Sequence, residues 1–391
     1  MIVKDVFSAF DKSDPRRVPG PMAHPVYTFD HDPSPEEMRA MAIRAMRDMV
    51  AVQWFPRDTV RYRKQGAVSN KQFEFFAERY YMGLPYTSAG MGIFQFLTLY
   101  DGGTGCLLFA DQDRFNMIVG NSCASSVGWG LLSVCSSVKG SLISNFLTVP
   151  NGFYPLGGVR YDPNLADFKQ YVTEEIVRDN GVQRIMEGYA AVQPGDVLVF
   201  AENTPAAGHT RMAISPAQTV RNEDGTIDPE KSTITTEEQA AKDNEDTSTG
   251  ILMIRSGQIS KTYTFAEFLK KSYIAVTTAE FMGQKPYEKC DLRYEGKSET
   301  LNDLEKGSLV CNYPMALLRA VLTDGRGETV LSRELFDRKM IGSGLARNYP
   351  LANFIADLKE GGSLPANGDA SLTLEITAST GEIYRPVSVR V

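Results

Sequence analysis

One cysteine in this sequence lies where a thiol gains nucleophilic character. Cys123 follows Asn121 and Ser122, two residue types that favour the N-cap of a helix, and the pattern of apolar residues predicts a helix over 122–138. In the first turn of a helix, unpaired backbone N–H groups and the helix dipole favour the thiolate over the thiol. A free cysteine can equally be a small buried apolar residue. This segment alone leaves both interpretations of Cys123 open.

A base for such a nucleophile must come from few histidines, because the chain has only His24, His31 and His209. The first two lie in a proline-rich segment that predicts irregular structure. His209 begins a predicted strand that runs to Ile214. A histidine at the mouth of a strand can meet a cysteine on a helix and take its proton, although it can also simply bind a loop carbonyl. The combination with Cys123 favours a Cys–His pair.

The order of these motifs resembles the NlpC-type cysteine peptidases, bacterial papain-like enzymes that cut peptide bonds in cell-wall peptidoglycan. The resemblance covers roughly residues 80–260. It rests on Gly83-Leu84-Pro85-Tyr86-Thr87, on Cys123 at a helix start, on Gly195-Asp196-Val197-Leu198-Val199-Phe200, and on His209 at a strand start. Two departures stand out. The family's Asp-Cys-Ser-Gly reads Ser122-Cys123-Ala124-Ser125 here, and an insertion over 91–120 predicts a reshaped substrate groove.

The resemblance implies a thiol protease mechanism without metal or organic cofactor. Cys123 would attack an amide carbonyl, and His209 would take its proton and later protonate the leaving amine. Tyr86 would bind the oxyanion together with the Cys123 backbone N–H. The substrate that the resemblance implies is a peptide, namely a stem peptide of peptidoglycan or a fragment of it.

A third catalytic residue is expected on the strand that follows His209. If Asp224-Gly225 centres a tight hairpin, the register pairs His209 with residue 240, so that Gln239 or Glu238 lies within reach. Gln239 has a side-chain oxygen that can accept from the imidazole, and we prefer it to Glu238, the alternative. Residues 237–249 are otherwise acidic and polar, which favours a solvated loop over a calcium site.

Composition excludes several other functions. The net charge of −7 offers no basic footprint for nucleic acid. The apolar runs stay shorter than the ~18 residues that a membrane span needs, so an integral membrane protein is not expected. Five scattered cysteines without a Cys-x-x-Cys pair argue against a zinc ribbon or a dense disulfide framework, and three histidines argue against a His-rich metal centre.

The N-terminal charges from Lys4 to Asp14 predict that the chain does not begin with a secretory signal peptide. A protein with that N-terminus is intracellular, exported in another way, or trimmed. A cell-wall substrate would imply the cell envelope or secretion. The compartment and the oligomeric state stay open.

The elements that must position these residues predict an α+β protein with two domains. Ser34-Pro35-Glu36-Glu37 predicts the start of an amphipathic helix that runs to about Trp54. A second helix is expected over 70–81, a third over 164–179, and strands near 196–200, 209–214, 232–236 and 251–255.

Residues 1–282 are interpreted as a papain-like hydrolase domain with an N-terminal helical extension. A polar linker over 283–307 is expected to lead into a small all-β sandwich, with residues 283–391 as the second domain. Two alternatives to the peptidase remain: an amidase or acyltransferase that uses the same Cys–His pair, and a non-catalytic cell-surface binding protein with a papain-like fold.

Overall fold

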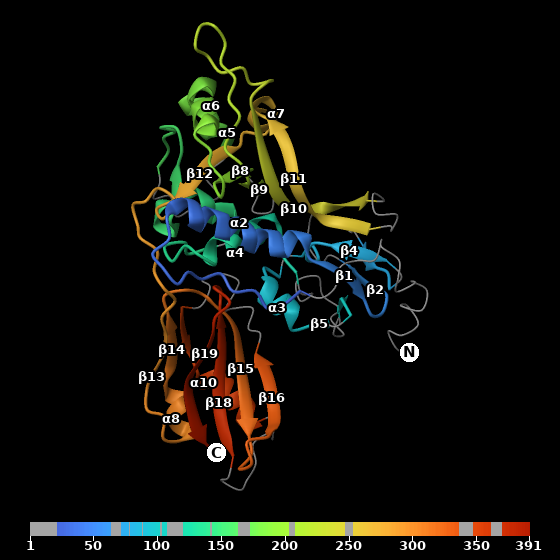
Figure 1. Cartoon of the computed structure of the whole chain (residues 1–391), viewed down its shortest axis with the longest axis vertical. Helices are drawn as coiled ribbons and strands as arrows, with labels where there is room; N and C mark the ends of the chain where they lie inside the picture. Colours follow the sequence, from blue (N-terminus) through green and yellow to red (C-terminus); the bar gives the residue numbers. More distant parts are fainter. Residues whose placement is uncertain are drawn as a thin grey trace. The chain divides into compact units, whose positions relative to one another are not determined.

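The computed structural model describes residues 22–63, 72–77, 79–87, 89–101, 104–107, 120–140, 143–162, 173–202, 208–246, 253–335, 347–360 and 370–391 (Figure 1). The prediction about the N-terminal charges, the centre of the 91–120 insertion, the start of the 164–179 helix and the end of the 237–249 loop lie outside these ranges. The chain divides into two units. Unit 1 holds residues 1–25 and 31–287, and unit 2 holds residues 26–30 and 288–391. The boundary predicted at 282/283 therefore falls a few residues early.

Unit 1 is a mixed α+β unit built on a ten-stranded sheet in the order β5-β6-β1-β4-β11-β10-β9-β8-β12-β7. Its neighbours are antiparallel except for the pairs β1–β6 and β4–β11. The strands of unit 1 are β1 (Gln53–Pro56), β2 (Val60–Arg63), β3 (Gln72–Phe75), β4 (Tyr80–Met82), β5 (Tyr100–Asp101), β6 (Cys106–Leu107), β7 (Phe153–Pro155), β8 (Val197–Ala201), β9 (Gly208–Ala213), β10 (Thr233–Asp246), β11 (Met253–Thr264) and β12 (Ile274–Thr278). The helices are α2 (Pro35–Ala51), α3 (Ile93–Leu97), α4 (Cys123–Leu132), α5 (Thr173–Asn180), α6 (Val182–Ala190) and α7 (Phe265–Lys270), with 3₁₀ turns at Ile143–Leu147 and Val149–Asn151.

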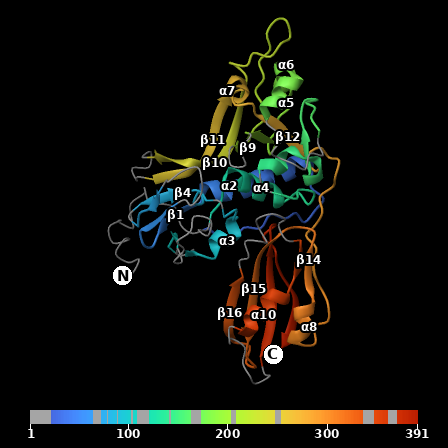
Figure 2. The same ribbon diagram turned by 180° about the vertical axis from the view of Figure 1, so that it is seen from behind.

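Helices α2 and α4 lie side by side against the middle of this sheet (Figures 1 and 2). Helix α2 contacts β10 and β11, and α4 contacts β9 and β10. The two helices approach closely because Gly130 has no side chain, and a Cβ there would lie 3.0 Å from the Cβ of Met46 and 3.1 Å from the Ala42 carbonyl oxygen. The predicted start of α2 is confirmed, since Ser34 and Glu37 form the expected capping box. The helix ends at Ala51, before the predicted Trp54, which lies in β1.

A buried ion pair fastens α2 to the Gly195-Asp196 motif that precedes β8. The Arg39 guanidinium donates to Asp196 Oδ1 at 2.7 Å and to the Pro194 carbonyl at 2.7 Å. It also donates to the Phe281 carbonyl at 3.2 Å and stacks on the Phe281 ring. Asp196 is therefore a structural residue. Helix α2 is an integral part of unit 1 and not an extension added to it.

Two sequence predictions in unit 1 are wrong. Residues 70–81 do not form a helix, because the described part of this segment contains β3 and the start of β4. The alternation in Gln72-Phe73-Glu74-Phe75 fits a strand. The start of the acidic 237–249 segment is not a solvated loop. It continues β10 to Asp246, and Glu237, Glu238 and Gln239 are buried.

Unit 2 combines two antiparallel sheets with two helices. One sheet has the order β13-β14-β17 and the other β16-β15-β18-β19. The strands are β13 (Leu292–Glu295), β14 (Ser308–Cys311), β15 (Met315–Thr323), β16 (Thr329–Leu335), β17 (Asn348–Pro350), β18 (Ser371–Ala378) and β19 (Ile383–Arg390), and the helices are α8 (Leu301–Lys306) and α10 (Ala352–Glu360). The all-β prediction is wrong because of α8 and α10. The 283–307 segment is likewise not simply a linker, because β13 and α8 form within it. None of the helices in the described ranges has the length and apolarity to cross a bilayer.

Candidate active site

Cys123 is the first residue of α4, as the sequence predicts. Ser122 is the N-cap, and it forms a capping box in which the Ser122 backbone N–H donates to Ser125 Oγ at 2.7 Å. The Cys123 N–H lies in the first turn, where no intrahelical carbonyl is available to it. The residue is only 3% exposed. Its sulfur therefore lies at the positive end of the helix in a largely dry environment.

His209 reaches this sulfur from the neighbouring strand. It lies on β9, opposite Phe200 of β8, and β9 contacts α4. His209 lies close enough to Cys123 for each side chain to shift the pKa of the other. The Nε2 atom of His209 is hydrogen-bonded to Glu238 Oε2, so Nδ1 is the ring nitrogen that this bond leaves available. The structure thus brings together the cysteine and the histidine that the sequence singles out.

Glu238, and not the preferred Gln239, is the partner of His209. The strands β9 and β10 pair Ala213 with Thr236 and Met212 with Glu237, which is the register that the sequence argument assumed. Side chains alternate between the two faces of a strand, so this register places Glu238 on the face of His209 and Gln239 on the opposite face. The Gln239 amide instead donates to the Leu84 carbonyl and, at 3.3 Å, to Ser256 Oγ. The assignment of Gln239 as the third residue is therefore corrected to the alternative, Glu238.

Two residues that the sequence argument missed hold Glu238 in place. Arg211 Nε donates to Glu238 Oε2 at 2.8 Å, and the Tyr263 hydroxyl donates to Oε1 at 2.6 Å. The Arg211 guanidinium also stacks over the Tyr263 ring at 3.9 Å from its centroid and lies 5.2 Å from that of Tyr273. Arg211 could have been found from its position two residues after His209, since such residues share one face of a strand.

Tyr86 lies beside Cys123 although the 91–120 insertion separates them in the sequence. Its hydroxyl is 4.0 Å from the Cys123 sulfur. A short parallel bridge pairs Tyr86 with Asn121. In it the Thr87 N–H donates to the Asn121 carbonyl at 2.9 Å, and the Asn121 N–H donates to the Pro85 carbonyl at 3.1 Å. This close approach requires Gly120, because a Cβ there would lie 2.1 Å from the Pro85 carbonyl oxygen. The bridge fixes Tyr86 relative to the start of α4.

The charges of this cluster favour a thiolate–imidazolium pair. Burial by itself raises the pKa of the Cys123 thiol, but the charge and hydrogen bond of His209 outweigh it and lower the pKa to about 7. Burial lowers the pKa of His209, and the charges and hydrogen bonds of Cys123 and Glu238 outweigh it and raise the pKa to about 9. Burial raises the pKa of Glu238, but its bonds to His209 and the charge of Arg211 lower it to about 2. Burial also raises the pKa of Tyr86, which keeps its hydroxyl protonated as a donor.

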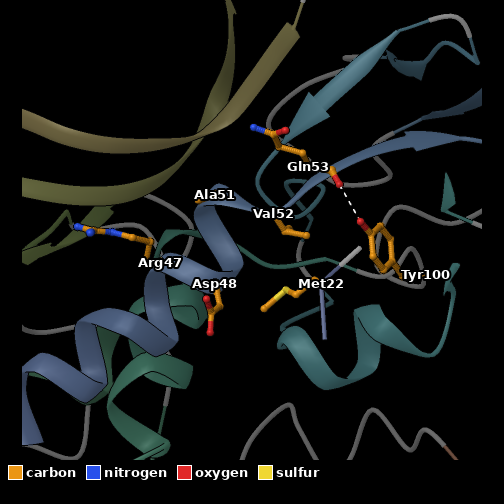
Figure 3. Close-up of a pocket in the computed structure, with 7 residues that line it drawn as sticks. All are labelled: Met22, Arg47, Asp48, Ala51, Val52, Gln53 and Tyr100. Carbon is orange, nitrogen blue, oxygen red and sulfur yellow. Dashed lines mark hydrogen bonds between the residues drawn. The ribbon is translucent and has the colours of Figure 1, made fainter. Parts of the chain in front are cut away.

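A separate cavity of about 260 Å³ lies at the C-terminal end of α2. It is lined by Met22, Arg47, Asp48, Ala51, Val52, Gln53 and Tyr100, and the Tyr100 hydroxyl donates to the Gln53 carbonyl at 3.1 Å (Figure 3). None of these residues belongs to the Cys123 cluster. Arg47 also donates from Nε to the buried Glu237 Oε1 at 2.6 Å. In the described parts of the chain, no group of three or more His, Cys, Asp or Glu side chains is placed to hold a metal ion.

The chain was compared with known protein families, curated proteins and solved structures. No family model matches it, and neither a curated protein nor a solved structure does. The chemistry of the cluster must therefore be argued from its own geometry.

Proposed function

We propose that this protein is a cysteine hydrolase that cleaves amide bonds with Cys123, His209 and Glu238. One observation carries the proposal: a cysteine at a helix N-terminus has its pKa lowered by a neighbouring histidine, and one ring nitrogen of that histidine is held by a buried carboxylate. A nucleophile, a base and a residue that orients the base are the three parts that covalent acyl transfer needs. A protein with a purely binding role has no chemical need for this order of contacts.

In the proposed mechanism, the Cys123 thiolate attacks the carbonyl carbon of the amide, and the negative charge moves to the carbonyl oxygen. The Cys123 backbone N–H and the Tyr86 hydroxyl, which lies 4.0 Å from the Cys123 sulfur, would donate to that oxygen. The His209 imidazolium gives its proton to the leaving amine, and the C–N bond breaks to leave a thioester. His209 then takes a proton from water, the hydroxide attacks the thioester, and the thiolate is released.

Glu238 orients His209 and stabilises its charged form throughout this cycle. A carboxylate that accepts from Nε2 fixes the tautomer and leaves Nδ1 available to exchange a proton with the thiol. The pair Arg211 and Tyr263 keeps Glu238 ionised and in one rotamer. This resembles the papain-like arrangement, with a carboxylate at the third position, and the papain-like fold of unit 1 is part of the proposal.

The substrate that we propose is a peptide of the bacterial cell wall, and this part rests on the motif resemblance. Purified peptidoglycan and its soluble stem peptides should be incubated with the full chain, and the products identified by mass. Cleavage at one amide bond, lost in C123A and retained in C290S, is the expected result. Transfer of the acyl group to an added amine without hydrolysis would make the protein an acyltransferase. Absence of any covalent Cys123 intermediate, with wall peptides and with simple amides alike, would overturn the hydrolase proposal.

A further inference from the structure

Two cysteines of unit 2 lie close together and have no part in the proposed catalysis. Cys290 precedes β13 by two residues, and Cys311 ends β14 opposite Leu292 (Figure 1). Their sulfur atoms are 3.6 Å apart. A disulfide requires a separation of about 2.05 Å, so the sulfurs need to approach by only about 1.5 Å, which side-chain rotation can supply. The other three cysteines, Cys106, Cys123 and Cys135, belong to unit 1.

The two thiols differ in access and in ionisation. Cys290 is partly exposed, whereas Cys311 is only 4% exposed. The neighbouring Cys311 thiol lowers the pKa of Cys290, while burial opposes it. The hydrogen bond with Cys290, together with burial, raises the pKa of Cys311. An accessible thiolate beside a protected thiol is the arrangement of an attacking and a resolving cysteine.

We propose that Cys290 and Cys311 form a reversible disulfide by exchange with a small disulfide such as oxidised glutathione. The Cys290 thiolate attacks one glutathione sulfur, and the glutathione S–S bond breaks to release one glutathione thiolate. Cys311 gives its proton to solvent and attacks the Cys290 sulfur, and the mixed S–S bond breaks to release the second glutathione thiolate. The protein dithiol is oxidised, and oxidised glutathione is reduced to two reduced molecules.

The bond would close a loop that contains β13, α8 and β14. Cys290 also belongs to the segment that enters unit 2 from unit 1, and the Tyr384 hydroxyl of β19 donates to its carbonyl at 3.0 Å. The disulfide would therefore link this entering segment covalently to the β13-β14-β17 sheet. Such a link restricts the unfolded chain and stabilises the folded unit. This inference does not depend on the proposed hydrolase activity.

The test uses the full chain with C123A, so that the reactive thiol of unit 1 does not interfere. After incubation with oxidised glutathione, the intact mass should fall by two hydrogen atoms, and digestion without reductant should give one linked peptide pair that contains Cys290 and Cys311. Dithiothreitol should restore the original mass. The double variant C123A/C311S should keep a single glutathione on Cys290. The double variant C123A/C290S should stay unmodified while folded.

The melting temperature of the oxidised chain should exceed that of the reduced chain by several degrees, about 5 °C or more. A stable mixed disulfide at Cys290 with Cys311 still reduced would overturn the proposal. A linked pair that involves any other cysteine would overturn it as well.

Discussion

The two ends of α4 place two buried cysteines in opposite electrostatic environments. Cys123 begins the helix, and Cys135 follows its last residue by three positions. They are 3% and 0% exposed, so burial alone would raise the pKa of both thiols. At Cys123 the charge of His209 and its hydrogen bonding reverse that effect. At Cys135 burial is reinforced by the charge of Glu280. A buried cysteine becomes a nucleophile only where its surroundings stabilise negative charge.

The largest effect on activity should come from removal of the Cys123 sulfur. C123A should lower the rate of amide hydrolysis by about 10⁴-fold or more, because the acyl group loses its acceptor. The fold should persist, since alanine fits the start of a helix. Circular dichroism and the rate of product formation measure the two quantities. C135A is the matched control at the other end of α4, and comparable loss of activity in both variants would contradict the assignment.

Removal of the imidazole should make Cys123 behave more like Cys135. In H209Q the thiol keeps its burial and loses the charge that opposes it, so its pKa should rise above its ordinary value of about 9. Iodoacetamide alkylation of Cys123 at pH 7 should then slow by about 50-fold or more, because the thiolate becomes a minor species. Site-resolved mass spectrometry of the labelled peptides gives the rate. Unchanged labelling would mean that His209 does not act on this sulfur.

The alkylation rates of Cys123 and Cys135 should also differ in their dependence on pH, and this difference is expected to be smaller than the effects of the two substitutions. Since the pKa of Cys123 is lowered to about 7, its thiolate is present above that pH, and its alkylation rate should fall about tenfold per pH unit below it. Hydrolysis should rise through pH 7 and decline above about 9, where His209 loses the proton that the leaving amine requires. Cys135 should still label slowly at pH 8. A rising limb near pH 9 for Cys123 would contradict the ion pair.

Two adjacent glutamates test which carboxylate supports the histidine. E238Q should lower hydrolysis by about tenfold and shift the alkaline limb of its pH profile to lower pH, because His209 loses the charge that raises its pKa. E237Q removes an equally buried carboxylate on the opposite face, which Arg47 binds. The alkaline limb of the pH profile of E237Q should stay where it is in the unmodified protein. A shift of the limb in both variants would indicate a general loss of structure.

The smallest effect is expected from the carboxylate near Cys135. Glu280 accepts from the Ser137 N–H at 2.9 Å and from the Ser137 hydroxyl at 2.6 Å, and its charge is the second cause of the raised pKa of Cys135 after burial. E280Q keeps an acceptor oxygen and removes the charge, so alkylation of Cys135 at pH 8 should increase by less than about tenfold. A larger increase would show that charge, and not burial, keeps this thiol inert.

The sequence predicted the two site residues whose local signals are strong, and it failed where partners are distant in the chain. Cys123 could be placed by its cap, and His209 by the strand that it begins. Register alone leaves both Gln239 and Glu238 near His209, and only the alternation of side chains between the two faces of a strand selects Glu238. The predictions of a helix over 70–81 and of an all-β second domain are wrong for related reasons. Strand β3 is held extended by pairing with β2, and β4 by pairing with β1 and β11. Helix α8 is polar in sequence, and its start is marked only by the capping box of Thr300 and Asp303.

The ion pair between Arg39 and Asp196 has a consequence for the order in which this chain can fold as it is synthesised. Helix α2 leaves the ribosome early, but its partners α4, β10 and β11 are made later, and the Phe281 carbonyl that Arg39 binds is made after all of them. The buried methionines of α2 therefore stay uncovered while most of unit 1 is translated. Exposed apolar surface on a nascent chain promotes aggregation and recruits chaperones. Arg39 can complete its set of partners only when residue 281 has left the exit tunnel, so the final packing of α2 comes late in the synthesis of unit 1.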